Sequence, residues 1–228
     1  MAIPPQKFSL TLSAKRALTY DVWELDFSAP ADFSCQPGQF VMFTLTPAPS
    51  RAYSIAWAQP GFLRFIIKRA AGGGGGSMAI CDLAVGSSIP VMGPFGHFVL
   101  PDAPAPRLFI GTGTGFAPLY FQARALLEKD PKATVRFLFG VREYRDMFYV
   151  AELDAWVKKY PNFSYAPCLS REEHEHGHKG YVTDLLGKED IEDFQEFSIC
   201  GSPKMVADAR IKLEEAGIAK EKIFFEQY

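Results

Sequence analysis

The sequence predicts two domains, an antiparallel β-barrel followed by an α/β domain with a parallel sheet, and two patterns carry this prediction. From residue 8 to residue 99 the apolar residues alternate in short runs, as half-buried strands require. After residue 106 short apolar runs alternate with helix-length segments, which is typical of a parallel sheet with helices on both faces. We expect the first domain to span residues 1–101 and the second to span 106–228.

Proline and glycine signals separate the expected elements. The expected barrel strands are 7–18, 22–29, 39–46, 53–58, 62–69 and 87–93. The expected strands of the second domain are 107–111, 135–141, 163–170 and 197–201, with helices at 117–130, 146–160 and 203–217 and a short apolar segment at 182–187. The proline-rich stretch Pro101–Pro106 forms the expected boundary, because proline fixes an extended connector.

Charge and hydropathy exclude several classes of protein. The 228 residues carry a formal net charge of −2, which gives no basic surface for nucleic acid. No segment approaches the roughly 18 to 20 apolar residues of a membrane span, and the first residues lack the apolar core of a secretory signal. We therefore expect a cytoplasmic protein with no nucleic-acid partner and no membrane span.

The cysteines and histidines give no metal signal. The four cysteines are scattered, whereas iron–sulfur and structural zinc sites usually contain paired cysteines. Three alternating histidines could form a metal tract, but in so charged a stretch they are more typical of a solvated loop. The prediction is no metal centre. These residues are Cys35, Cys81, Cys168 and Cys200, and His174, His176 and His178.

The glycine-rich segment 72–77 has the composition of a flexible linker, but a cut there would separate the last barrel strand from the others. The following residues 78–86 have the length and apolar spacing of a short helix. We therefore predict a turn that leads into a helix and lets backbone N–H groups approach an anion. Ser77 could both cap this helix and donate its hydroxyl to a phosphate.

A second glycine-rich turn follows the first strand of the α/β domain. Gly111, Gly113 and Gly115 alternate before a helix that carries Pro118 near its start. Small residues here let backbone amides and the helix dipole face an anion, so the segment predicts a nucleotide pyrophosphate site. Phe116 replaces the third glycine of the dehydrogenase fingerprint. A turn without a ligand is the alternative.

Arg51, Tyr53 and Ser54 form a third candidate site. In a strand Arg51 and Tyr53 share one face, which would place a cation for phosphate beside an aromatic ring, with the Ser54 hydroxyl nearby. An arginine and a tyrosine on an exposed barrel face is the simpler interpretation.

The order of the motifs resembles that of the ferredoxin-NADP reductase superfamily. The likeness runs along nearly the whole chain, in segments 51–54, 74–77, 93–98, 111–118, 200–203 and 224–228. The resemblance implies a flavin-binding barrel and a nucleotide-binding α/β domain. It places Arg51 on the flavin phosphate, Tyr53 against the ribityl or isoalloxazine, Ser54 near flavin N5, and the turn ending in Ser77 at the FAD pyrophosphate.

The same resemblance implies the site residues of both domains. Ser54 and Cys200 are the candidates at the reacting centre, with Cys200 beside the nicotinamide. Glu226 and Tyr228 resemble residues that approach the flavin, with a frayed chain end as the alternative. The expected cofactor-binding residues are Arg51, Ala52, Tyr53, Ser54, Lys68, Gly74, Gly75, Gly76, Ser77, Gly111, Thr112, Gly113, Thr114, Arg142, Ser170, Arg171, Cys200, Gly201, Ser202 and Tyr228.

The choice between NADH and NADPH depends on a few cationic residues. Ser170 and Arg171 follow the third strand of the α/β domain and resemble the element that binds the 2′-phosphate in NADPH-using relatives. Arg142 follows the preceding strand and could assist. These residues favour NADPH slightly, with NADH and exposed loop arginines as the alternative.

The resemblance implies a reductase in which NAD(P)H delivers hydride to bound FAD. Electrons would then pass to a separate ferredoxin, flavodoxin or oxygenase component, because the chain lacks the cysteines of a fused iron–sulfur domain. Two alternatives stay open: an NAD(P)H:flavin reductase that uses free flavin as a substrate, and a nucleotide-binding electron-transfer subunit of a larger complex.

Overall fold

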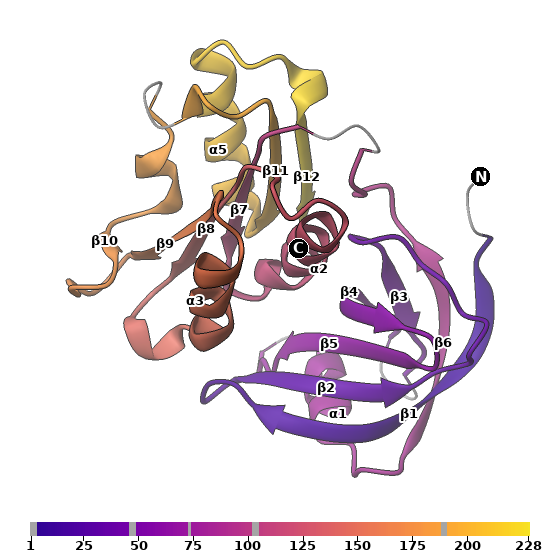
Figure 1. The fold of residues 1–228 in the computed structure, drawn as a ribbon. Helices are drawn as coiled ribbons and strands as arrows, with labels where there is room; N and C mark the ends of the chain where they lie inside the picture. Colours follow the sequence, from indigo (N-terminus) through magenta and orange to yellow (C-terminus); the bar gives the residue numbers. More distant parts are fainter. Residues whose placement is uncertain (1–3, 46–48, 73, 102–104, 188–190) are drawn as a thin grey trace. The chain divides into compact units, whose positions relative to one another are not determined.

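The computed structural model of the protein divides into two compact units, Met1–Leu100 and Pro101–Tyr228 (Figure 1). It describes the whole chain except residues 1–3, 46–48, 73, 102–104 and 188–190. Part of the proline-rich boundary and the end of the expected strand 39–46 therefore lie outside the described residues.

The first unit is a closed antiparallel barrel with the strand order β1-β2-β5-β4-β3-β6. This confirms the predicted barrel, and all six expected strands form. Their bounds are β1 Gln6–Ala17, β2 Val22–Ser28, β3 Phe40–Phe43, β4 Arg51–Gln59, β5 Phe62–Lys68 and β6 Ser88–Phe95. A short helix, α1, spans Gly76–Cys81 between β5 and β6.

Aromatic side chains fill the interior of the barrel. Phe27, Phe43 and Phe65 are fully buried and meet edge to face, with ring centroids 5.1 to 5.9 Å apart. Each comes from a different strand, and each lies on the inward face that the period-two alternation of its strand predicts. These contacts join the opposite walls of the barrel.

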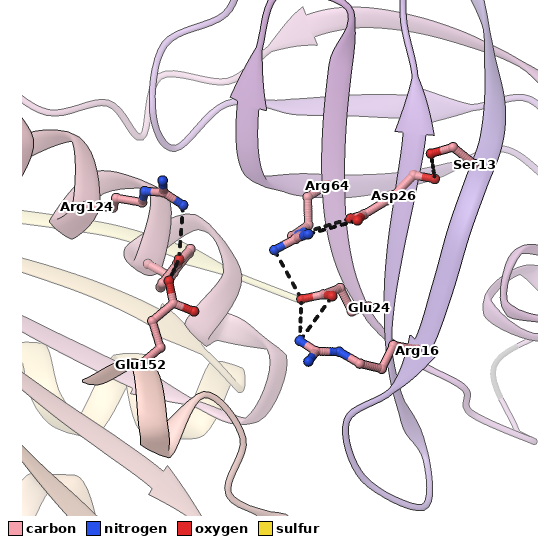
Figure 2. A network of polar contacts seen from close by, with 8 residues as sticks. Ser13, Arg16, Glu24, Asp26, Arg64, Arg124 and Glu152 are labelled. Carbon is pink, nitrogen blue, oxygen red and sulfur yellow. Dashed lines mark hydrogen bonds and ion pairs between the residues drawn. The ribbon is translucent and has the colours of Figure 1, made fainter. Parts of the chain in front are cut away.

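A polar network crosses β1, β2 and β5 (Figure 2). Arg64 donates two hydrogen bonds to the carboxylate of its cross-strand partner Asp26, at 2.7 and 2.8 Å. The Arg64 guanidinium also lies 3.4 Å from one carboxylate oxygen of Glu24. Arg16, which belongs to β1, lies 3.1 Å from the other oxygen of that carboxylate. Glu24 is 5 % exposed, so Arg64 offsets the desolvation of a buried carboxylate.

The second unit contains a parallel sheet with the order β10-β9-β8-β7-β11-β12. This confirms the predicted α/β class. The strands are β7 Arg107–Thr112, β8 Val135–Val141, β9 Phe163–Leu169, β10 His178–Lys179, β11 Glu196–Gly201 and β12 Ile223–Gln227. The sequence analysis did not predict β10 and β12, because the first is two residues long and the second stands at the chain end without a flanking turn signal.

Helices cover both faces of this sheet, and the two faces differ in composition. The main helices are α2 Phe116–Lys129, α3 Val150–Lys159 and α5 Pro203–Glu215, and a 3₁₀ turn, η3, spans Val182–Leu185. Under α2 and α3 the packing is aromatic. The ring centroids of Phe116 and Phe139 lie 4.7 Å apart, and Tyr120 stacks on Trp156 with centroids 5.2 Å apart. Under α5 and η3 it is aliphatic, with Ile110, Leu138, Ile199, Val206 and Leu213 among its members.

The aromatic face also contains a polar anchor between its two helices (Figure 2). The buried Tyr120 of α2 donates its hydroxyl proton to Glu152 of α3, and Arg124 donates to the same hydroxyl oxygen at 3.4 Å.

Within the described parts of the chain, no helix has both the length and the apolar character that a bilayer crossing requires.

We expect Arg64→Met to lower the free energy of unfolding of the barrel by about 2 kcal/mol, because it removes the bidentate bond to Asp26 and the cation beside Glu24. Guanidinium titration followed by circular dichroism measures this. Arg16→Met is the matched control: its side chain is 65 % exposed, so the loss should stay below about 1 kcal/mol. Equal losses in the two variants would contradict this account of the network.

Candidate cofactor sites

Arg51 and Tyr53 lie at the start of β4, where the strand register places them opposite the buried residues Phe43 and Val41 of β3. The guanidinium of Arg51 donates to the carbonyl oxygen of Ser50 at 3.2 Å and makes no ion pair among the described residues. The ring of Tyr53 packs edge to face on Phe43, with centroids 5.6 Å apart. Burial raises the pKa of Tyr53 to about 12, so its hydroxyl keeps its proton at neutral pH.

The glycine-rich turn packs directly on the Arg51 side chain. A Cβ atom added at Gly76 would lie 2.8 Å from Arg51 Cγ, and one at Gly74 would lie 3.1 Å from Arg51 Nη2. Gly74 and Gly75 have backbone φ angles of 70° and 80°, which residues other than glycine rarely adopt. The structure therefore brings together Arg51 and the turn, two motifs more than 20 residues apart in the sequence.

The prediction of a turn that leads into a helix is confirmed, but the predicted helix bounds and cap are wrong. Helix α1 begins at Gly76 and ends at Cys81, and Gly75 is its N-cap residue. Ser77 lies inside the first turn, where its Oγ accepts a hydrogen bond from the backbone N–H of Ala70 at 3.1 Å. Ser77 thus ties the turn to the segment after β5, and its own proton stays available to an anion.

The other first-domain candidates lie on the strands around this turn. Lys68, an expected cofactor-binding residue and the last residue of β5, forms an ion pair with Asp21 at 2.9 Å. Ala52 is exposed, and Ser54 lies opposite Phe40 of β3.

In the second unit the candidates converge where the chain direction across the sheet reverses. From β7 the chain continues to β8 and β9 on one side, and later returns to β11 and β12 on the other. In open parallel sheets, ligands bind at the carboxyl ends of the strands at such a switch point. The turn Gly113–Gly115 follows β7 there, and Ser202 follows the adjacent end of β11.

Each of the three alternating glycines is required for a different physical reason. A Cβ atom at Gly111 would lie 3.0 Å from Leu119 of α2, so this glycine sets the distance between helix and strand. Gly113 has a φ angle of 54° with open space around it. A Cβ atom at Gly115 would lie 2.6 Å from the Cys200 carbonyl carbon and 2.8 Å from Gly201 N. Gly115 therefore lets the β7 turn pack against the end of β11.

Gly115 is absent from the site residues that the sequence analysis selected. The signal was present in the sequence, because Gly115 is the last of three alternating glycines directly before a helix. Its contact with β11 depends on strand order, which local sequence does not specify.

Cys200, Gly201 and Tyr228 complete the same cluster. Burial raises the pKa of the Cys200 thiol well above its ordinary value, with Glu226 acting in the same direction, so Cys200 stays a neutral thiol. Tyr228 continues the pairing of β12 with β11, since its N–H donates to the Gly201 carbonyl oxygen at 3.4 Å. The alternative of a frayed chain end is wrong for residues up to Gln227, which form β12.

The Tyr228 side chain reaches back to the glycine turn. Its hydroxyl lies 3.1 Å from Thr114 Oγ1 and donates to the Thr112 carbonyl oxygen at 3.3 Å, while the residue as a whole is 61 % exposed. Burial of the hydroxyl raises the pKa of Tyr228, whereas the hydrogen bonds from Thr114 and Gly115 act in the opposite direction.

Arg142, Ser170 and Arg171 meet at the ends of β8 and β9. The Arg171 N–H donates to the Arg142 carbonyl oxygen at 2.9 Å, and the Ser170 N–H donates to the Val141 carbonyl oxygen at 3.1 Å. Both arginines are exposed, and neither guanidinium forms an ion pair within the described ranges of the chain. The sheet thus presents two adjacent cations on the same edge as the glycine turn.

The three histidines of the charged stretch do not converge on one point. His174 stacks on Tyr144 with centroids 3.8 Å apart, His176 lies 3.4 Å from Glu175, and His178 lies 3.9 Å from Asp184. Among the residues with described positions, no cluster of three or more histidine, cysteine or acidic side chains could hold a metal ion.

Comparison with known proteins agrees with this geometry. The family model of the oxidoreductase FAD-binding domain matches residues 9–100, and that of the oxidoreductase NAD-binding domain matches residues 109–210. The chain is 35 % identical to ferredoxin–NADP reductase B of Sorangium cellulosum, over 99 % of both chains. It belongs to the ferredoxin-NADP reductase superfamily. This membership confirms what the order of the motifs implied, a FAD-binding barrel followed by an NAD(P)H-binding α/β domain.

Other relatives are longer. The reductase component of propane 2-monooxygenase from Rhodococcus jostii is 29 % identical over 99 % of this chain, which spans 65 % of that protein. The solved structure of an Amycolatopsis cytochrome P450 reductase superposes with a TM-score of 0.91 at 26 % identity, and the match covers 98 % of this chain and 70 % of that one.

The described residues fit both cofactors of the superfamily. In the barrel, Arg51 and a turn without side chains offer a cation and free backbone to a phosphate group. In the α/β domain, the open turn at Gly113 precedes the 14-residue helix α2, whose positive end favours an anion.

We expect Gly115→Ala to destabilise the α/β domain by about 3 kcal/mol, because the new Cβ atom would overlap the backbone of Cys200 and Gly201, which would have to move. Gly113→Ala is the matched control, since it meets no neighbour and should cost only about 1 to 2 kcal/mol for its left-handed φ angle. Thermal unfolding of the two variants measures the difference. Equal melting temperatures would contradict the proposed contact with β11.

Proposed function

We propose that this flavoprotein passes electrons from NADPH through bound FAD to a separate acceptor protein, a ferredoxin, a flavodoxin or an oxygenase component. The observation that carries this proposal is the 35 % identity to a ferredoxin–NADP reductase, over 99 % of both chains. The reductase component of an oxygenase system among the relatives supports the wider choice of acceptor.

FAD, when bound, would accept a hydride from NAD(P)H and release electrons singly. In this chain Arg51 would neutralise phosphate charge, and the backbone of Gly74, Gly75 and Gly76 would approach the pyrophosphate. Tyr53, protonated at neutral pH, would donate a hydrogen bond and present its ring to the flavin.

The turn at Gly113 and Thr114 would hold the pyrophosphate of the dinucleotide, and Gly201 and Ser202 would border the nicotinamide. Ser54 and Cys200 would contact the reacting centre as neutral groups, because Cys200 keeps its proton. Their contribution would be placement of the reactants rather than acid–base chemistry.

NADPH rather than NADH is the proposed donor because of Arg142 and Arg171. A 2′-phosphate requires cationic partners, and these two arginines are adjacent, exposed and without an ion pair among the described residues. Glu172 lies beside them, but its carboxylate accepts a hydrogen bond from the Tyr144 N–H at 2.7 Å. That bond holds the acidic group on the backbone after β8.

The decisive experiment is an absorption spectrum of the purified protein, with release and identification of any flavin and anaerobic titration with NADPH and NADH. We expect retained FAD that is bleached by NADPH at lower concentration than by NADH, and loss of this preference in Arg171→Ala. Reduction of cytochrome c that depends on added ferredoxin or flavodoxin then tests the acceptor. A colourless protein that oxidises NADPH only with added free flavin would establish the flavin-reductase alternative instead.

We expect Arg51→Met to weaken FAD binding about 10- to 100-fold, because a charge-assisted bond to phosphate is lost, while the free energy of unfolding changes little. Flavin fluorescence titration measures the affinity, and denaturant unfolding measures the stability. Arg16→Met, which removes a barrel arginine far along the sequence from the turn, should retain the wild-type affinity. Unchanged affinity in Arg51→Met would refute the role of Arg51.

A further inference from the structure

The segment that follows β5 is tied to both ends of α1. The backbone N–H of Ala70 donates to Ser77 Oγ in the first turn of the helix, at 3.1 Å. The guanidinium of Arg69 donates two hydrogen bonds, each 2.8 Å long, to the carboxylate of Asp82, the C-cap residue. Arg69 is itself held by its backbone N–H, which donates to the Asp21 carbonyl oxygen at 2.7 Å. One short stretch of chain thus fixes where α1 starts and where it ends.

A lysine from β1 holds the same C-terminal end of the helix. Lys15 Nζ donates to the carbonyl oxygen of Cys81 at 3.2 Å and to that of Leu83 at 2.8 Å. Cys81 is the last residue of α1, so its carbonyl oxygen has no partner within the helix, and the helix dipole favours a cation there. Two cations from separate parts of the barrel therefore anchor this end of α1.

The turn Gly74–Gly76 has no side chains with which to hold its own position. A Cβ atom at Gly75 would meet nothing within 4 Å, and glycine loses more conformational freedom on ordering than any other residue. The turn is joined to α1 by a hydrogen bond from the Ala79 N–H to the Gly75 carbonyl oxygen, 2.9 Å long. The position of the turn is therefore coupled to that of the helix.

We propose that Lys15 and Arg69 are positioning residues for FAD, which hold α1 so that the Gly74–Gly76 turn stays ordered for phosphate and FAD is released slowly. This inference rests on the proposed function, which places the FAD pyrophosphate at that turn. The two cations act through the helix, because they contact its C-terminal end and the turn lies at its other end, about 9 Å away.

Lys15→Met and Arg69→Met test the inference in the full chain freed of flavin, with FAD and riboflavin as probes. Riboflavin has the same ring system and ribityl chain as FAD but no phosphate. Flavin fluorescence titration should show each variant binding FAD about threefold to tenfold more weakly than the wild type, the effect of one or two hydrogen bonds, with faster FAD release. The riboflavin affinity should stay the same. Lys15→Arg keeps a cation at the helix end and should restore most of the FAD affinity.

Lys7→Met is the matched control for charge. Lys7 is an exposed residue of the same strand and lies opposite Met92 of β6, so its loss should leave both affinities as in the wild type. Both partners of the Arg69 ion pair are at least 37 % exposed, so Arg69→Met should fold as the wild type does.

Equal weakening of FAD and riboflavin binding in Lys15→Met and Arg69→Met would indicate a general loosening of the barrel and overturn the positioning role. Unchanged FAD affinity in both variants would also overturn it, while leaving the proposed FAD site intact. Failure of the wild type to bind FAD would overturn the site and the inference together.

Discussion

The close approach of two backbone segments, the turn after β7 and the end of β11, is the constraint on which the nucleotide-binding unit depends. Gly115 permits it, because any side chain there would overlap the backbone of Cys200 and Gly201. The contact joins two strand ends that lie about 85 residues apart in the sequence, and it fixes the position from which α2 starts. Without it, the turn amides and the β11 end would not face one ligand.

The barrel also depends on a glycine in a tight space, although there the neighbour is a side chain and not a second backbone segment. Gly76 lies so close to Arg51 that a methyl group would displace the arginine side chain. Ser77 ties the turn to Ala70 through its hydroxyl, so the turn is held between the ends of β4 and β5. In both units a glycine allows a close approach that a side chain would prevent, to the Arg51 side chain in the barrel and to the end of β11 in the second unit.

The helices that support the nucleotide site are fixed from one side of the sheet by aromatic packing. Phe116, the first residue of α2, contacts Phe139 and Phe148, so the helix start is held where its dipole meets the turn. Further along α2, Tyr120 stacks on Trp156 and donates to Glu152. Rigid support of this kind leaves the turn itself free to be half-exposed, as a ligand site must be.

The sequence by itself determined the fold class and the family, and it supplied the candidate site residues as predictions. The switch from period-two alternation to apolar runs between helices marks the change from barrel to parallel sheet. The glycine turns, Arg51 and Tyr53 were recognisable because each short motif has a local physical reason for its residues. The helix α1 was placed less well, since Ser77 has the chemistry of a cap but the chain places Gly75 there.

Only the tertiary structure decided which distant residues act together. Strand order places Gly115 against β11 and Tyr228 over the turn, and no local pattern contains that order. The ion pair of Lys68 with Asp21 likewise joins residues that are far apart in the sequence. Local sequence specifies backbone preference and burial, whereas contacts between residues far apart in the chain follow from how the strands are assembled.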